Sequence, residues 1–228
     1  MNLTFVSKGK LSDFIISDLP KIKAPDVLVF SNKIIEKLDL IEEIDGKTNV
    51  FYELCKLSEN LGCVLIIGCD TEILGILHKS AIVIDSGNLL GVSDMAHILD
   101  DSKYNSGGCF RVYDTSKGKI GLVIGDDILF PEVLRTLTLS DSDIIISIYG
   151  KIHNAIPQVM MRAASYFNGV NICMAAESYV QISDIKGEVL CATDAGVFEY
   201  SLEIIKDYHL IQARRRGFYR EIYSSFNV

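Results

Sequence analysis

The stretch of sequence that decides the fold is Gly118-Lys-Ile-Gly-Leu-Val-Ile-Gly125-Asp-Asp-Ile-Leu-Phe-Pro-Glu132. The apolar run before Gly125 predicts a buried strand, and Pro131 followed by Glu132 is typical of the first turn of a helix. A buried strand, a sharp turn and a helix start form the layout that holds a catalytic nucleophile in several enzyme classes. Here the turn carries Gly125, which has no side chain and therefore supplies no nucleophile.

Short runs rich in β-branched and aliphatic residues predict strands along the chain. The predicted strands are Leu3–Ser7, Asp26–Ser31, Cys63–Gly68, Ile76–Asp85, Lys119–Ile124, Asp143–Ile148, Val170–Ala176 and Tyr179–Ser183. Val27–Phe30 and Ile144–Ile146 are apolar throughout, which is typical of strands covered on both faces by helices or by another sheet. Lys186-Gly187-Glu188, between two strand-like runs, predicts a hairpin turn.

Helical patterns alternate with the strands. They cover Asn49–Leu61, Pro131–Ser140 and Asn154–Asn168, with a short helix at Leu11–Leu19. We expect Thr48 or Asn49 to cap the first of these patterns and Asn154 the third, while Gly62 and Gly169 follow the helix ends. The alternation, without a linker or repeat, predicts one α/β domain over residues 1–228 with mixed sheets.

Composition narrows the class of protein. The chain has 228 residues, 49% of them hydrophobic, and can bury a thick core. Its formal net charge of −8 argues against binding to nucleic acid or anionic membranes. We expect no signal peptide, and no apolar run approaches the roughly 18 residues of a membrane span. The six cysteines show no zinc spacing, so we expect free thiols and a cytoplasmic location.

Three short patterns give little support for a nucleotide, metal or acid–base site. Asp45-Gly46-Lys47-Thr48 ends like a phosphate-binding loop, but Ile41 stands where that motif needs Gly. The four histidines (78, 97, 153 and 209) have no partner at helical metal-ligand spacing, so no metal is expected. We expect Asp127 to cap the helix that opens at Pro131; Asp126 at the mouth of a pocket is the alternative role for this pair.

A family resemblance follows from these residues. Gly118–Glu132 is similar, without a gap, to the pattern Gly-Lys-Ile-Gly-hydrophobic-hydrophobic-Ile-Cys-Tyr-Asp-x-x-Phe-Pro-Glu of the carbon–nitrogen hydrolase (nitrilase) superfamily. Similar segments follow the family's order at Gly46–Gly68, Ser80–Asp85, Asn154–Ala176 and Ala213–Tyr223. Lys79 stands in place of the family's Asn before the second of these segments. The resemblance therefore covers nearly the whole chain.

The resemblance implies a four-layer α-β-β-α sandwich, with two mixed β-sheets flanked by helices. It also implies pairing through the helices into a homodimer, with residues 210–228 as a C-terminal tail used in dimer contacts. Members of the family hydrolyse or condense amides and nitriles with a Glu, a Lys and a Cys, and need no cofactor. In such a trio a thiolate attacks the carbon, a carboxylate moves protons, and an ammonium stabilises the developing negative charge.

All three positions of the trio carry another residue in this sequence. Asn32 stands in the Glu place, Met95 in the Lys place and Gly125 in the Cys place. An amide is no base, a thioether carries no charge, and glycine has no nucleophile. Losing the whole trio predicts that the family's mechanism is unavailable.

Neighbouring residues do not restore the trio. Lys33 and Glu36 lie past the end of the predicted strand, while His97 and Asp100 only keep the family's register around Met95. The vestigial pocket is expected to be bordered by Asp94, His97, Asp126 and Asp127. These acidic residues favour neutral or cationic ligands.

The leading hypothesis is a catalytically inactive nitrilase-like protein, a homodimer or higher homo-oligomer, that binds a small ligand or another protein. The alternative is an amide or nitrile hydrolase with a relocated nucleophile, for instance Cys173 or an Asp–His pair, since no Gly-x-Ser-x-Gly elbow occurs at the turn. A third hypothesis is a structural partner of an active relative.

Overall fold

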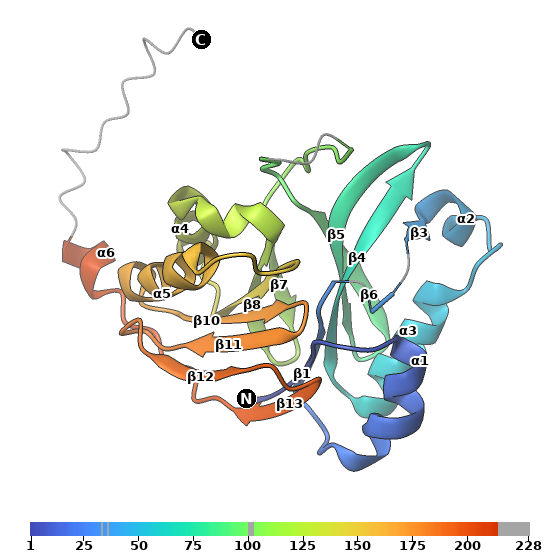
Figure 1. Cartoon of the computed structure of the whole chain (residues 1–228), viewed down its shortest axis with the longest axis horizontal. Helices are drawn as coiled ribbons and strands as arrows, with labels where there is room; N and C mark the ends of the chain where they lie inside the picture. The colour runs from blue at the N-terminus through green and yellow to red at the C-terminus, as the bar shows by residue number, and fades with distance from the viewer. Residues whose placement is uncertain (33, 36, 100–102, 214–228) are drawn as a thin grey trace, which may run out of the picture.

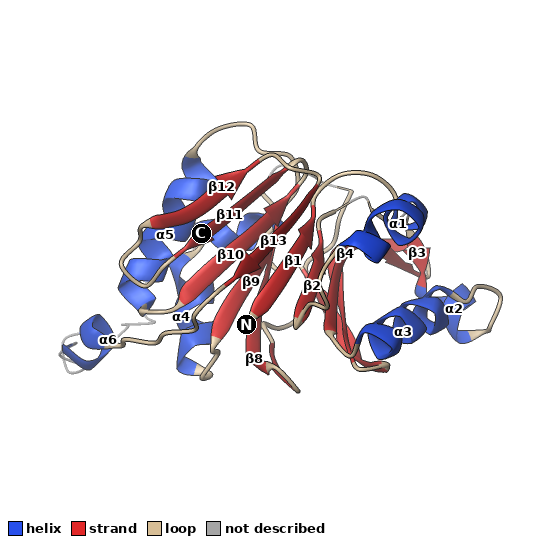
Figure 2. Ribbon diagram, turned by 90° about the horizontal axis from the view of Figure 1, so that it is seen from below, coloured by secondary structure: helices blue, strands red, loops and turns tan. Residues whose placement is uncertain are grey.

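The computed structural model describes residues 1–32, 34–35, 37–99 and 103–213. These residues form two mixed β-sheets packed face to face, with helices on the two outer faces (Figure 1, Figure 2). The predicted α/β sandwich of two mixed sheets flanked by helices is therefore confirmed.

The first sheet has the strand order β13-β1-β2-β4-β5-β6, with the short β3 beside β4. Its strands are β1 (Asn2–Val6), β2 (Val27–Phe30), β3 (Leu38–Asp39), β4 (Val64–Ile73), β5 (Ile76–Asp85), β6 (Asn88–Asp94) and β13 (Val197–Ser201). The parallel strands β1, β2 and β4 form its centre, and β13 pairs antiparallel with β1. The chain therefore leaves the second sheet after β12 and returns to complete the first.

The second sheet has the order β12-β11-β10-β9-β8-β7. Its strands are β7 (Val112–Thr115), β8 (Gly118–Ile124), β9 (Ile144–Ile148), β10 (Asn171–Ala176), β11 (Tyr179–Ser183) and β12 (Val189–Thr193). Strands β8, β9 and β10 are parallel, as expected for apolar strands joined by helices. The carboxyl ends of β8 and β9 lead directly into the candidate site.

Helices cover the outer faces. The first sheet carries α1 (Leu11–Asp13), which continues as a π-helical and a 3₁₀ turn to Lys21, together with α2 (Leu40–Ile44) and α3 (Val50–Leu61). The second carries α4 (Pro131–Leu139) and α5 (Ile156–Asn168), and α6 (His209–Ala213) contacts α5. In the part of the chain that the structure describes, no helix is long and apolar enough to cross a bilayer.

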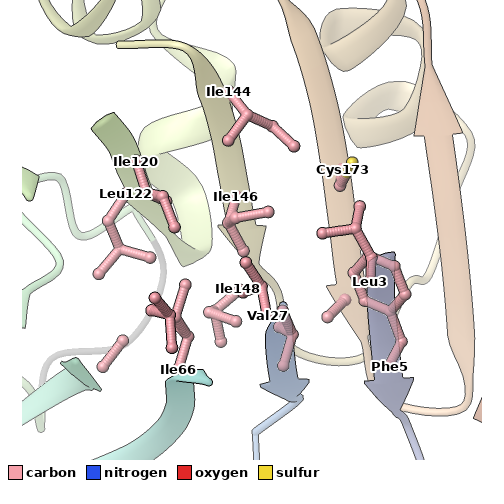
Figure 3. Close-up of a cluster of buried hydrophobic side chains, with 14 of the residues drawn as sticks. Leu3, Phe5, Val27, Ile66, Ile120, Leu122, Ile144, Ile146, Ile148 and Cys173 are labelled. Atoms are coloured by element: carbon pink, nitrogen blue, oxygen red, sulfur yellow. The ribbon is translucent and has the colours of Figure 1, made fainter. Parts of the chain in front are cut away.

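The core between the sheets is formed by alternate residues of the central strands. Val27 and Ile66 of the first sheet share one buried cluster with Ile146 and Ile148 of β9 (Figure 3). Each of these side chains is fully buried. Because successive strand residues point to opposite faces, the continuous apolar runs also supply the two outer cores beneath the helices.

One predicted helix cap is confirmed in position only, because Asn49 is the N-cap of α3 but makes no capping hydrogen bond with its side chain. The side chains of Thr48 and Asn49 do not cap α3; instead the Glu43 carboxylate accepts the backbone N–H of Phe51 at 2.7 Å and the Thr48 hydroxyl. Because this carboxylate belongs to the last turn of α2, the start of α3 is bound by a residue outside the capping sequence next to the helix. The N-cap of α5 is Ala155 and not Asn154 as predicted, although the Asn154 side chain, one residue earlier, accepts the backbone N–H of Ile156 at 2.9 Å.

The segment after β13 is anchored on the end of α5. The backbone N–H of Asp207 donates to the carbonyl of Gly169 at 2.9 Å, and Lys206 pairs with Asp143 at 2.6 Å and with Asp141 at 3.1 Å. These contacts hold residues 203–208 against the second sheet. The predicted dimer tail, residues 210–228, lies outside the described residues from 214 onward.

Candidate functional site

The strand–turn–helix elbow forms as the sequence predicts. Strand β8 ends at Ile124, Gly125 begins a 3₁₀ turn that reaches Leu129, and Pro131 begins α4. Gly125 is buried and has φ +53°, a backbone conformation that strains residues with a side chain. Glycine is therefore the residue that this turn accommodates without strain.

Met95 fills the space beside the elbow. A Cβ atom at position 125 would lie 2.5 Å from Sδ of Met95, closer than any real contact allows. Met95 follows β6, is 1% exposed, and is fixed by its backbone N–H, which donates to the Lys79 carbonyl at 2.8 Å. The structure therefore brings together two of the three predicted trio positions.

The thioether of Met95 also covers the backbone donor at the elbow. The N–H of Asp126 points to Sδ of Met95 at 3.4 Å. In a catalytic elbow, the N–H that follows the nucleophile is suited to bind a developing oxyanion. A thioether sulfur is only a weak acceptor, so this donor is covered but poorly satisfied.

Asn32 lies two residues after β2, at the same end of the sandwich. Asn32 is 7% exposed. A Cβ atom placed on Gly68 would lie 2.6 Å from Oδ1 of Asn32 and 2.4 Å from a side-chain carbon of Ile148. Ile148 pairs in register with Ile124, the residue before the elbow. Asn32 Oδ1 has no hydrogen-bond partner among the described residues, although buried polar atoms are normally paired.

The expectation that Asp127 caps α4 is wrong. Its carboxylate, 2% exposed, accepts the backbone N–H groups of Ala96 at 3.0 Å and His97 at 2.8 Å, and contacts His97 Nδ1 at 2.7 Å. The N-cap of α4 is Phe130, without a side-chain hydrogen bond. Burial raises the pKa of Asp127, while the three hydrogen bonds oppose this shift. Asp127 therefore fixes the loop that carries Met95.

The other residues predicted to border the pocket differ in whether they face the elbow. His97 stacks on Phe130 with ring centroids 3.8 Å apart, beside the elbow. Asp94 lies next to Met95 in the chain, but its carboxylate accepts the Ser80 hydroxyl at 2.6 Å. Because Ser80 lies between Lys79 and Ala81 on β5, it points away from the core between the sheets, so Asp94 does not face the elbow. Asp126 is half-buried. The pKa of Tyr149 is raised mainly by burial of its own hydroxyl and further by the charge of Asp126.

The sequence analysis did not assign Lys79, Asp70 or Tyr104 to the candidate site. Lys79 passes the elbow, with Cδ 3.9 Å from a Cβ at Gly125, and its ammonium lies 4.9 Å from the centroid of the Tyr104 ring. The Tyr104 hydroxyl donates to Asp70 at 2.8 Å, and Asp70 pairs in register with Lys79. Side chains alternate between the two faces of β5, so this alternation could have placed Lys79 on the same face of the sheet as Ala81. Asp100, Lys33 and Glu36 lie outside the described residues.

Cys173 does not reach the site. It is fully buried between the sheets (Figure 3), where burial strongly raises the pKa of its thiol. Cys109 differs, because it is exposed and its sulfur accepts the Nε–H of Arg111 at 3.5 Å. Within the described ranges, no group of three His, Cys, Asp or Glu side chains is placed to hold a metal ion.

Comparison with known proteins identifies the family. A model of the carbon–nitrogen hydrolase family matches residues 27–196, which include the whole second sheet, the elbow and strands β2 to β6 of the first sheet. The chain therefore belongs to the carbon–nitrogen hydrolase (nitrilase) superfamily.

Two curated relatives match part of the chain. A probable nitrilase of Schizosaccharomyces pombe is 31% identical over 112 residues, 46% of this chain and 41% of that protein. A nitrilase of Pyrococcus abyssi is 29% identical over 114 residues, 48% of this chain and 43% of that protein. The matched part thus spans less than half the length of either relative.

Solved structures match almost the whole chain. A carbon–nitrogen hydrolase from Helicobacter pylori G27 superposes with a TM-score of 0.74 at 17% identity, over 96% of this chain and 97% of that one. A double mutant of the amidase from Nesterenkonia sp. AN1 in complex with acrylamide gives 0.75 at 13% identity, over 96% and 95%. Saccharomyces cerevisiae Nit3 gives 0.75 at 13% identity, over 95% and 93%. At these identities the likeness shows the fold.

Proposed function

We propose that this protein is a catalytically inactive member of the superfamily that binds a small ligand at the elbow or acts as a protein-interaction module. The observation that carries the proposal is Met95, whose thioether occupies the space beside Gly125 and covers the N–H of Asp126. The Nesterenkonia amidase, in contrast, has an active-site cysteine to which acrylamide adds. In this chain the elbow carries glycine.

Each step of cysteine-based amide hydrolysis lacks its group at this elbow. Gly125 offers no thiolate to attack the carbonyl carbon, and the Asn32 amide cannot take up the proton that a carboxylate would accept. The N–H of Asp126, which would stabilise the negative charge that forms on the carbonyl oxygen, is covered by the sulfur of Met95. When catalytic groups act as a unit, removing even one of them lowers the reaction rate by orders of magnitude.

The first test is ammonia release from the purified chain over a panel of amides and nitriles. We expect no release above that of the heat-denatured chain, with the Nesterenkonia amidase as the active control in the same assay. The chain is first shown to be folded by circular dichroism. Turnover that stays with the protein through purification to homogeneity would contradict the proposal.

A relocated nucleophile is the second candidate, and Cys109 is the observation that favours it. This thiol is exposed, and its sulfur accepts the Nε–H of Arg111 at 3.5 Å. The protein would then be an amide or nitrile hydrolase with its chemistry on the loop that precedes β7. Cys173 is unsuited to this role because it is buried.

Cysteine labelling separates the two candidates. In the native protein we expect iodoacetamide to modify Cys109 about tenfold faster than the buried thiols or more. Cys69 and Cys173 should react only on unfolding, because they are buried, and burial raises the pKa of Cys69 to about 12. Loss of a measured amidase activity on Cys109 labelling, and in Cys109→Ser, would favour the relocated nucleophile. Labelling without any such activity agrees with an inactive protein.

We also propose a cytoplasmic homodimer that pairs through α5. Three apolar side chains of this helix, Ile156, Val159 and Phe167, are more than half exposed at 57%, 56% and 52%. Exposed apolar side chains on one helix are typical of a subunit contact. A role as the structural partner of an active relative would use the same face.

A further inference from the structure

Lys79 places a cation beside the elbow. It lies two residues before Ala81, which belongs to the core between the sheets, and alternate residues of a strand share a face. Its side chain passes Gly125 and is half-buried, and its ammonium lies over the ring of Tyr104 at 4.9 Å. The site therefore has a positive charge, although Met95 has none.

Three carboxylates near Lys79 accept hydrogen bonds from other groups, and that of Asp126 lies near Tyr149, whose pKa is raised by burial and by this charge. Asp70 accepts the Tyr104 hydroxyl, Asp94 accepts the Ser80 hydroxyl, and Asp127 binds the loop at 96–97. Over the described ranges, Lys79 forms no ion pair. A cation–π contact contributes only about 0.5–2 kcal/mol, so a partly desolvated ammonium still favours an anionic oxygen.

A second donor points to the same place. The N–H of Asp126 meets only the weak acceptor Sδ of Met95, at 3.4 Å. A carboxylate oxygen is a far stronger acceptor for both an ammonium and a backbone N–H. Methionine has a flexible side chain, so the thioether is able to rotate away when a better acceptor enters.

We infer that the elbow binds a small carboxylate, held by the ammonium of Lys79 and, once the Met95 side chain has moved, by the N–H of Asp126. The inference rests on the proposed function, because the ligand stays bound without being hydrolysed. It reverses the expectation of a neutral or cationic ligand. That expectation counted Asp94, which faces the other way, and omitted Lys79.

The test uses three molecules of similar shape and different charge: propionate, propionamide and propylamine. Binding is followed by NMR on the methionine methyl groups, with the Met95 signal assigned by its loss in Met95→Val. We expect propionate to bind most tightly and to shift the Met95 methyl signal. Lys79→Met should weaken propionate binding about tenfold or more, since one charged hydrogen bond is lost.

Two variants serve as controls. Lys79→Arg keeps the charge and should retain most of the affinity. Lys103→Met removes a second lysine, whose ammonium lies 4.8 Å from the centroid of the same Tyr104 ring, and should leave the affinity for propionate nearly unchanged. Equal or tighter binding of propylamine or propionamide, no binding of propionate, or an unchanged affinity in Lys79→Met would each overturn the inference.

The outcomes for the two proposals stay distinguishable. Ammonia is measured in the propionamide samples, and its release would overturn inactivity while the charge series still reports on Lys79. Propionate binding that does not depend on Lys79 would overturn the carboxylate site while inactivity stands. If Lys79→Met does not fold, the wild-type charge series and Lys79→Arg decide the question.

Discussion

Gly125→Ala is expected to destabilise the protein by about 2–4 kcal/mol, the sum of a strained backbone and an overpacked contact. The left-handed backbone at φ +53° disfavours any side chain, and the new Cβ would lie 2.5 Å from Sδ of Met95. Urea unfolding of the variant and the wild type measures the difference. A cost no greater than the backbone strain would mean that the thioether moves aside without a penalty.

A double-mutant cycle separates the two causes. Met95→Val removes Sδ but keeps a carbon near the position of Cγ, which lies 3.6 Å from the Cβ position. In that background Gly125→Ala should cost only the backbone strain of about 1–2 kcal/mol. Equal costs in the two backgrounds would contradict the contact. The cycle also implies that a cysteine at 125 would be accommodated only if the Met95 side chain moved aside or were replaced.

Gly169→Ala is expected to cost about 4 kcal/mol or more, because several contacts fail together. A Cβ at this position would lie 1.7 Å from the carbonyl oxygen of Asp207, which is backbone and cannot turn aside as a side chain can. The segment 203–208 would have to leave the end of α5, losing the hydrogen bond from Asp207 and the ion pairs of Lys206. Urea unfolding measures the loss.

Gly62→Ala is the matched control. Gly62 ends α3 with φ +60° and ψ +36°, and Gly169 ends α5 with φ +65° and ψ +37°. No atom lies within 4 Å of a Cβ at Gly62, so that variant should lose only about 1–2 kcal/mol of backbone strain. Similar losses in the two variants would refute the close approach of Asp207. Faster hydrogen exchange at the Asp207 amide in Gly169→Ala would locate the damage.

The central architecture could be predicted because it rests on apolar runs. The predicted strands match β1, β2, β4, β5, β8, β9, β10 and β11, with ends shifted mainly at β4, which reaches Ile73. The sequence analysis did not predict β3, β6, β7 or β13, and it marked β12 only as a strand-like run after the hairpin turn at Lys186–Glu188. Strands β6, β7, β12 and β13 are edge strands without a continuous buried run, and β3 has two residues, so neither burial nor alternation marks them.

The elbow could be predicted from spacing, whereas its surroundings depended on contacts distant in sequence. The position of Gly125 follows from a strand, a turn and a helix start that are consecutive in the chain. Asp127 was assigned to the nearest helix because capping is a local rule, yet its donors come from residues 96 and 97. Lys79 was missed although strand alternation already placed it on the inner face.

The pairing of β13 with β1 determines when the molecule can be completed. Residues 2–6 and 197–201 are hydrogen-bonded neighbours, so β1 must wait during synthesis for a strand made almost two hundred residues later. Pairings so far apart in sequence slow folding and leave sheet edges open to wrong partners meanwhile. Until β13 has been made, the edge of β1 that pairs with it therefore stays open to other strands.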